Sequence, residues 1–154
     1  MSPLLGRRPR AGGPVRGYAA RMPLGHLGVN VPDLAAAREY YDTLMPLLDY
    51  EPFLDRENEF SYRPAGGKVG TYVFFYGALE DGEHTRHRPG LQHLAFMLRT
   101  RAAVHRVHDW VVARGGEIVY EPQEFPEYHR GYYAVFWLDP HGFMLEAVCH
   151  RDEG

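Results

Sequence analysis

The sequence predicts an α+β protein made of two βαβββ modules whose sheets curve around a shared cleft. Three observations support this prediction. The element order of strand, helix and three strands occurs twice along the chain. A His-Leu pair begins the first strand of each unit, at His26 and His93, and an alanine pair follows each, at 35–36 and 102–103. Repeats of this kind indicate paired units that bury their apolar faces together.

The first module is expected to span about residues 24–79. Apolar and polar residues alternate along 26–31, which is typical of a half-buried strand. Asp33 is a suitable N-cap for a helix over 34–48, and Pro46 is expected to disturb the last turn of that helix. Three further strands are then expected, at 50–53, 59–63 and 71–76.

The second module is expected to span about residues 90–150, so that one domain occupies 23–150. Thr100 is a suitable N-cap for a helix over 101–114, which a Gly-Gly pair ends. The run DPHG at 139–142 has turn chemistry, because Asp bonds nearby backbone, Pro fixes φ and Gly tolerates the fourth position. Strands are expected at 91–98, 118–121, 132–138 and 143–149.

The chain of 154 residues is 45% hydrophobic and 24% charged, which is ordinary for one globular domain. Its net charge of −3 and its lack of a long apolar run give no sign of a nucleic-acid or membrane partner. Cys149 is the single cysteine, so an internal disulfide is impossible and a reducing cytoplasm is favoured. We therefore expect a cytoplasmic protein that acts on a small molecule.

Residues 1–22 differ in composition from the rest of the chain. They hold five Arg and no acidic residue, together with several Gly and Pro. This composition predicts a flexible basic N-terminal arm. Without these five Arg the net charge changes from −3 to −8, so the folded body is acidic.

One acidic residue, Glu146, lies in the middle of an otherwise hydrophobic strand. A dry, unpaired charge there costs several kcal/mol, so the carboxylate needs a partner. His26 and His93 lie on the less hydrophobic faces of matching first strands, and paired modules could bring the three side chains together. Two His and one carboxylate can hold Fe(II), Mn(II), Ni(II) or Zn(II) with positions open for substrate. The alternative is three separate polar residues, each satisfied by other neighbours.

Further candidates lie around the last two strands. His129 could act as an acid or base beside the metal, or be an ordinary loop histidine. Tyr132 and Tyr133 are adjacent on a strand, so only one can face the cleft. Arg130 could pair with a substrate carboxylate or phosphate, or lie on the surface. The candidate catalytic residues are His129 and Tyr133, and the candidate substrate contacts are Tyr132, Arg130 and Phe75.

The run HLGVNVPDL from His26, together with VFWLDPHGFMLE ending at Glu146, resembles the vicinal oxygen chelate superfamily. That superfamily includes glyoxalase I, extradiol dioxygenases, methylmalonyl-CoA epimerase, fosfomycin-modifying enzymes and bleomycin-binding proteins. The resemblance covers about residues 24–150, and the segment 128–150 is similar to a glyoxalase-like branch without a firmly assigned reaction. It implies that His26, His93 and Glu146 are the metal ligands.

Glyoxalase I adds a fourth ligand, a carboxylate, from the last strand of the first module, and the strand at 71–76 contains no acid. The resemblance therefore implies another metal-dependent reaction on a small substrate that chelates through vicinal oxygens, by a lyase, an isomerase or an extradiol-type dioxygenase. The alternative is a non-catalytic, bleomycin-resistance-like binder, because 14% aromatic residues and an acidic body suit a cationic drug. A homodimer is expected, with modules that pair within one chain or swap between two.

Overall fold

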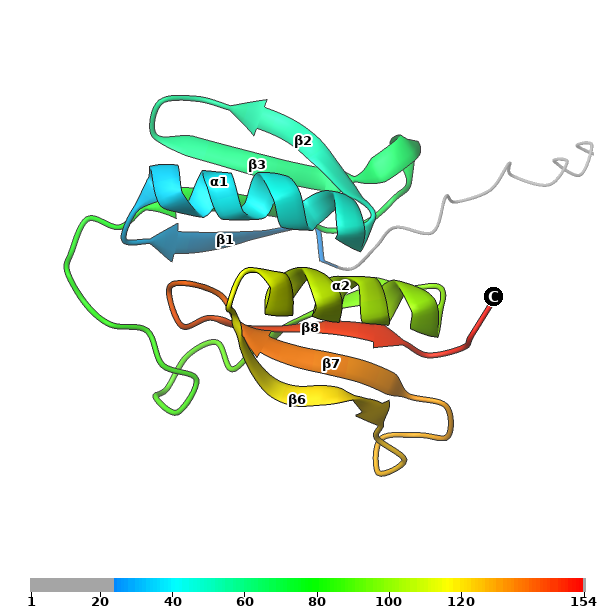
Figure 1. Ribbon diagram of the computed structural model, residues 1–154. Coiled ribbons are helices and arrows are strands. Elements are labelled where there is room, and N and C mark those ends of the chain that lie inside the picture. Colours follow the sequence, from blue (N-terminus) through cyan, green and yellow to red (C-terminus); the bar gives the residue numbers. More distant parts are fainter. Residues whose placement is uncertain (1–23, 154) are drawn as a thin grey trace, which may run out of the picture.

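The computed structural model describes residues 24–153, and the expected N-terminal arm lies outside this range. Module 1 contains β1 (His26–Val31), α1 (Leu34–Leu44), the 3₁₀ turn η1 (Met45–Leu48), β2 (Tyr50–Asp55), β3 (Glu59–Pro64), the turn η2 (Ala65–Gly67) and β4 (Tyr72–Gly77). Module 2 contains β5 (Leu94–Leu98), α2 (Arg101–Ala113), β6 (Glu117–Glu124), β7 (Tyr133–Leu138) and β8 (Met144–Cys149). The βαβββ order occurs twice, which confirms the predicted fold (Figure 1).

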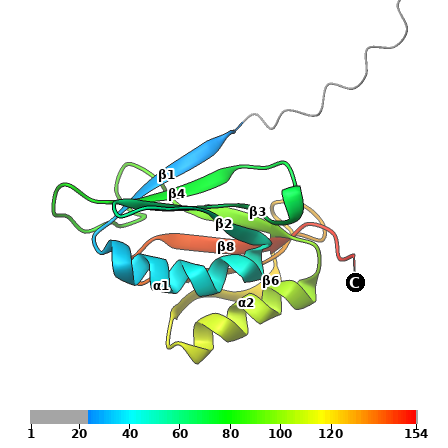
Figure 2. The ribbon, with the colours of Figure 1, turned by 90° about the horizontal axis from the view of Figure 1, so that it is seen from above.

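Each module forms its own four-stranded mixed sheet. The strand order is β1-β4-β3-β2 in module 1 and β5-β8-β7-β6 in module 2. In both sheets the first strand of the module pairs in parallel with its last strand, and the other pairs are antiparallel. Both helices lie along the same side of the sheets (Figure 2). We refer to the opposite side of each sheet as its helix-free face.

The predicted helix starts are confirmed. The side chains of Asp33 and Thr100 each accept a hydrogen bond from a backbone N–H of the following first turn, at 2.9 Å and 3.1 Å. The first helix ends at Leu44 rather than at residue 48, because Pro46 has no N–H to donate and the chain tightens into η1. Among the described residues, no helix is long and apolar enough to cross a membrane.

A single apolar core lies between the helices and the sheets and is shared by both modules. Removal of this apolar surface from water is the main force that holds the modules together. Its largest fully buried apolar members come from α1, η1, α2 and five strands, and they are Val31, Tyr41, Leu44, Met45, Leu48, Tyr62, Phe75, Val104, Val107, Trp137 and Leu145.

A buried carboxylate also joins the two modules. Asp139, at the start of the predicted DPHG turn, accepts a hydrogen bond at 2.7 Å from the hydroxyl of Tyr41 in α1. Its other oxygen accepts from the backbone N–H groups of His141 and Phe143, at 2.9 Å and 2.8 Å. Burial and the charge of Asp139 raise the pKa of Tyr41 well above its ordinary value, so the phenol keeps its proton and donates it to this bond.

Removal of the Tyr41 hydroxyl leaves one oxygen of Asp139 buried without a donor. We expect Tyr41→Phe to lower the free energy of unfolding by about 1–3 kcal/mol, measured by urea denaturation. Tyr128→Phe is the matched control, because this side chain is largely exposed and its hydroxyl makes no hydrogen bond to a described residue. The control should change stability by less than about 0.5 kcal/mol. Equal losses in the two variants would contradict the role assigned to the Tyr41–Asp139 bond.

Candidate metal centre

Glu146 lies fully buried on the helix-free face of the second sheet. Alternate residues of β8 point to opposite faces, and the neighbours Leu145 and Ala147 join the core under the helices. The register partner of Glu146 in β7 is Phe136, which packs in a smaller apolar cluster on the helix-free face. The structure therefore places the charge inside the protein, as the sequence pattern predicts.

The two carboxylate oxygens of Glu146 have different environments. Oε1 accepts a hydrogen bond from the hydroxyl of Tyr132 at 2.5 Å. Oε2 is shielded from solvent and accepts no hydrogen bond from any described residue. Nε2 of His93 lies 3.0 Å from Oε2, but this contact does not have the geometry of a hydrogen bond. Two such atoms face each other at low cost only when a proton or a cation is bound between them.

The spacing of the two atoms also fits a bound divalent cation. The side-chain oxygen of Gln92 contacts Nδ1 on the other side of the His93 ring. Nε2, on the side of the ring that faces Glu146, lies 3.0 Å from Oε2. Two ligand atoms that each lie about 2.1 Å from a six-coordinate ion, at right angles, are about 3 Å apart. The pair therefore fits a divalent metal that accepts imidazole and carboxylate ligands, such as Fe, Mn, Ni or Zn.

His26 lies on module 1 and is not beside this pair. It begins β1, its side chain is exposed, and its ring packs edge-on against Phe74 with the ring centroids 5.6 Å apart. Within residues 24–153, no three side chains of His, Cys, Asp or Glu lie close enough together to hold one metal ion. The structure thus brings together two of the three predicted ligands, His93 and Glu146.

The adjacent tyrosines contact different sides of the second sheet. The Tyr132 hydroxyl holds Glu146, and burial together with this hydrogen bond raises the pKa of the phenol, which keeps its proton. Tyr133 faces α2, where its hydroxyl lies 2.8 Å from Nε2 of His105 and 3.3 Å from the carbonyl of Pro122. Tyr132, expected to contact substrate, is therefore a support for the carboxylate. Tyr133, expected to be catalytic, lies away from it.

His129 and Arg130 lie in the loop that precedes β7. Nδ1 of His129 contacts the carbonyl of Arg130 at 3.0 Å, and Nε2 lies 2.8 Å from Nδ1 of His150. Both imidazole rings pack edge-on against Tyr132, with centroids 5.3 Å and 5.0 Å away. His129 thus lies behind the tyrosine that holds the carboxylate, and the Arg130 residue is exposed. His150 was not predicted, since a single His after a strand has no distinguishing pattern.

Phe75 lies in the core rather than at the cleft. It is almost fully buried and stacks on Phe60 with centroids 4.9 Å apart. Its neighbours Phe74 and Tyr76 point to the helix-free face, the face that carries His26. The alternation of side chains along β4 could have shown this from the sequence. Only the alternate residues that point away from the core can contact a ligand.

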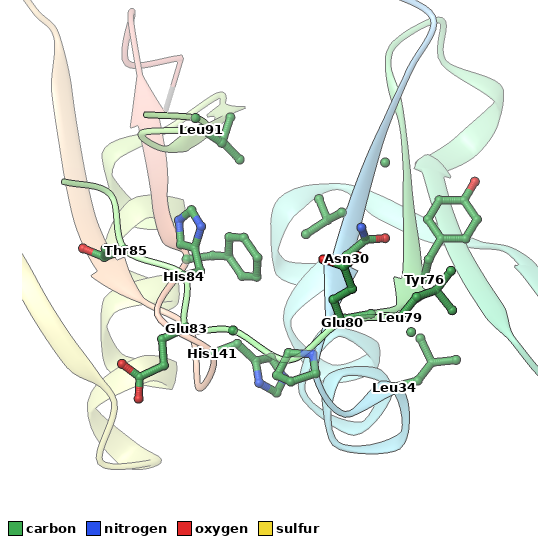
Figure 3. A pocket seen from close by; sticks show the side chains of 18 of the residues that line it. Asn30, Leu34, Tyr76, Leu79, Glu80, Glu83, His84, Thr85, Leu91 and His141 are labelled. Atoms are coloured by element: carbon green, nitrogen blue, oxygen red, sulfur yellow. The ribbon is translucent and has the colours of Figure 1, made fainter. Parts of the chain in front are cut away.

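A pocket of about 1710 Å³ lies between the two modules (Figure 3). In Figure 3, Asn30 and Tyr76 of module 1 lie on one side of the pocket. His84 and Leu91, of the connecting segment between β4 and β5, lie on the other side. The pocket is lined by three carboxylates and one guanidinium, which are Glu57, Glu80, Glu83 and Arg88. His93 and Glu146 are not among its lining residues, so the His93–Glu146 pair and this pocket are separate features.

Two βαβββ modules with a buried carboxylate beside a half-buried His on the helix-free face define a class: a glyoxalase-fold domain with a candidate divalent-metal centre. The family comparison agrees with this class. The chain belongs to the Glyoxalase/Bleomycin resistance protein/Dioxygenase superfamily, whose profile matches residues 23–147.

Individual relatives support the same assignment. YqjT of Bacillus subtilis (strain 168), an uncharacterized protein, is 28% identical over 127 residues, which cover 80% of this chain and 96% of YqjT. A crystal structure from Bacillus halodurans, of a protein with the provisional name glyoxalase, is 30% identical with a TM-score of 0.70 and covers 82% of this chain and 94% of that one. A glyoxalase/dioxygenase structure from Nostoc punctiforme, at 19% identity and a TM-score of 0.64, covers 90% and 98% and supports the fold alone.

The Tyr132–Glu146 bond can be tested without metal. We expect Tyr132→Phe to lower the free energy of unfolding by about 1–3 kcal/mol, because Oε1 of a buried carboxylate loses its donor. Tyr133→Phe on the adjacent position should cost less than about 1 kcal/mol, because its partner His105 is exposed and can bond water instead. Urea denaturation of chelator-treated protein measures both. A larger loss for Tyr133→Phe would contradict the assignment.

Proposed function

We propose that this protein is a divalent-metal-dependent enzyme that acts on a small substrate held through two neighbouring oxygens. The observation that carries the proposal is the buried Oε2 of Glu146, which lacks a hydrogen-bond donor among the described residues and lies 3.0 Å from Nε2 of His93. A structural carboxylate in a sheet would be expected to have both oxygens satisfied. An oxygen left this way beside a second ligand atom is the arrangement that a metal site requires before the metal binds.

His93 and Glu146 would hold the metal, and a bound divalent cation would supply Lewis-acid chemistry toward the substrate oxygens. Tyr132 holds the carboxylate by a hydrogen bond and Gln92 contacts the far nitrogen of His93, the positions that outer partners of metal ligands commonly occupy. The reaction classes that fit are those of a lyase, an isomerase or an extradiol-type dioxygenase. We propose that His129 carries protons near the site. We propose the cytoplasm as the location of the protein.

A third protein ligand would come from His26 in this proposal. Its exposed position on the other module leaves two routes, a closing of the modules within one chain or pairing with a second copy. We favour a homodimer, because the two modules already share one core and the Tyr41–Asp139 bond holds their relative position. A second copy can supply His26 without disrupting the shared core or the Tyr41–Asp139 hydrogen bond.

Metal binding to chelator-treated protein tests the proposal directly. We expect isothermal titration with Mn(II) to show binding by the wild type and a loss of at least about 100-fold in affinity for His93→Ala and for Glu146→Gln. His87→Ala is the matched control, because His87 is an exposed histidine of the connecting segment and should leave the affinity unchanged. Equal binding by the wild type and His93→Ala would sink the proposed metal site.

The origin of the third ligand can be resolved by mixing variants. His26→Ala and His93→Ala should each bind Mn(II) weakly. A refolded mixture of the two should recover binding, because a mixed dimer with shared sites contains one intact set of ligands. Lack of recovery, with both single variants defective, would instead mean that His26 acts within its own chain.

A second candidate function is the non-catalytic binding of a cationic aromatic compound. The pocket between the modules favours it, since three carboxylates against one guanidinium line a volume of about 1710 Å³, beside Tyr76 and Phe143. Cations are attracted both to carboxylates and to aromatic faces. In this function the His–Glu pair would have no role.

Proflavine, a planar aromatic cation, can probe this second function by fluorescence titration. We expect Glu83→Gln to weaken its binding by about two- to fivefold, since exposed charge pairs contribute modestly. Glu117→Gln, an exposed carboxylate on β6 outside the pocket, should have no effect. Binding that is unchanged by Glu83→Gln, or that requires Mn(II), would rule against the pocket as a separate drug-binding site.

A further inference from the structure

The pocket between the modules is larger than a site for one small molecule needs to be. Its volume is about 1710 Å³, whereas pockets for drug-sized ligands typically measure about 300–1,000 Å³. Its lining comes from both modules and from the connecting segment between β4 and β5, and it excludes His93 and Glu146. A ligand of this pocket is therefore independent of the proposed metal site, and the volume suits an extended chain.

The connecting segment is packed firmly into the pocket wall. The ring of His84 stacks on Phe143, with centroids 4.2 Å apart. At Gly142, where φ is +85°, a Cβ would lie 3.2 Å from the carbonyl oxygen of His84, so the absence of a side chain allows this close approach. Arg86 donates to the sulfur of Met144 at 2.7 Å. These contacts hold His84 in a fixed position against module 2.

Two imidazole nitrogens of the pocket lack partners. Nε2 of His84 and Nε2 of His141 are shielded from solvent and make no hydrogen bond within the described residues. Both side chains line the pocket (Figure 3). Shielded polar atoms normally have a partner, and an unprotonated imidazole nitrogen accepts hydrogen bonds. The two atoms therefore favour a ligand that carries N–H or O–H donors.

The charges of the pocket favour a cationic donor. Glu57, Glu80 and Glu83 are exposed, and their carboxylates make no hydrogen bond or ion pair with a described residue. Arg88, the guanidinium of the lining, donates to the backbone carbonyl of Glu83 at 3.2 Å. Acceptors therefore outnumber donors in the lining. An arginine side chain matches them, because a guanidinium has five N–H donors and no acceptor.

The N-terminal arm of this chain has the matching composition. Residues 1–22 contain five Arg and no acid, whereas the other residues contain 12 Lys and Arg against 20 acids, a net charge of −8. The hydroxyl of Thr71 donates to the carbonyl of Leu24 at 2.9 Å and fixes where the arm joins the domain. Twenty-two residues span up to about 70 Å, and a domain of this size has a radius of gyration of about 14 Å. The pocket is thus within reach of the arm of its own chain.

We propose that the N-terminal arm binds in the pocket between the modules of its own chain. Its guanidinium groups lie against the carboxylates of Glu57, Glu80 and Glu83. A tether of this length keeps the arm at an effective concentration near the millimolar range, so modest ion pairs are enough to fill the pocket. The arm then competes with any other cationic molecule that enters the pocket.

A labelled peptide of residues 1–22 tests the proposal by fluorescence anisotropy at low salt. One full-length variant has all five arginines of the arm changed to Gln, which are Arg7, Arg8, Arg10, Arg16 and Arg21. We expect this variant to bind the peptide at least about tenfold more tightly than the wild type does, because the wild-type pocket already holds its own arm. Equal binding by the two proteins would overturn the proposal.

The place of binding is tested in the same five-Arg→Gln chain. Adding Glu57→Gln, Glu80→Gln and Glu83→Gln should weaken the peptide at least about fivefold, since each exposed pair contributes modestly and three are lost. The matched control is Glu39→Gln, Glu117→Gln and Glu127→Gln, which removes the same charge at exposed positions outside the pocket. The control should change the affinity by less than about twofold. Equal losses from the two sets would show attraction to the whole acidic body and overturn the pocket as the site.

Tryptic cleavage after Arg16 and Arg21 shows whose arm fills the pocket. In otherwise wild-type chains, cleavage should be slower with the pocket carboxylates intact than with Glu57→Gln, Glu80→Gln and Glu83→Gln. The ratio of the two rates should be the same at about 1 μM and about 50 μM protein, because binding within one chain does not depend on concentration. Protection that increases with protein concentration would assign the arm to a second copy and contradict binding within the chain.

Discussion

Two buried carboxylates in module 2 differ in how fully the described residues satisfy them with hydrogen bonds. Asp139 receives three hydrogen bonds, one of them from Tyr41 across the boundary between the modules. Glu146 receives one, from Tyr132, and its second oxygen has no donor among the described residues. A buried charge is among the most costly groups that a protein can hold. The positions of the second sheet, Tyr132 and His93 are therefore best described relative to Oε2 of Glu146.

Asp139, whose oxygens both accept hydrogen bonds, sets the position of Glu146, whose second oxygen has no donor among the described residues. The turn at 139–142 fixes where β8 begins, and Asp139 fixes that turn, so Glu146 is paired with Phe136 on the helix-free face. A slip of one residue would turn Glu146 into the shared core. These features could be predicted from the sequence because their signals are local: a capping residue such as Asp33, a turn tetrapeptide, and one acid in an apolar strand.

Other parts of the site could not be predicted, because they depend on distant contacts. Which of Tyr132 and Tyr133 meets Glu146 is decided by the residue at which β7 begins, and a shift of one position exchanges their faces. His26 and His93 occupy equivalent positions of the repeat, yet equivalence along the chain does not bring them together. Their separation follows from the way the modules pack, which the shared core determines and no short motif encodes.

The parallel pairing of the first and last strand in each module also has a consequence for how the chain folds. Neither β1 nor β5 can complete its sheet until the fourth strand of its own module has been synthesised, since its partner is β4 or β8. Contacts of this separation make folding slow relative to helix formation. Glu146 lies in β8, the last strand of module 2, so His93 and Glu146 come together only when β8 has paired with β5 and β7. A chain in which β8 is not yet paired would therefore present His93 without its carboxylate partner.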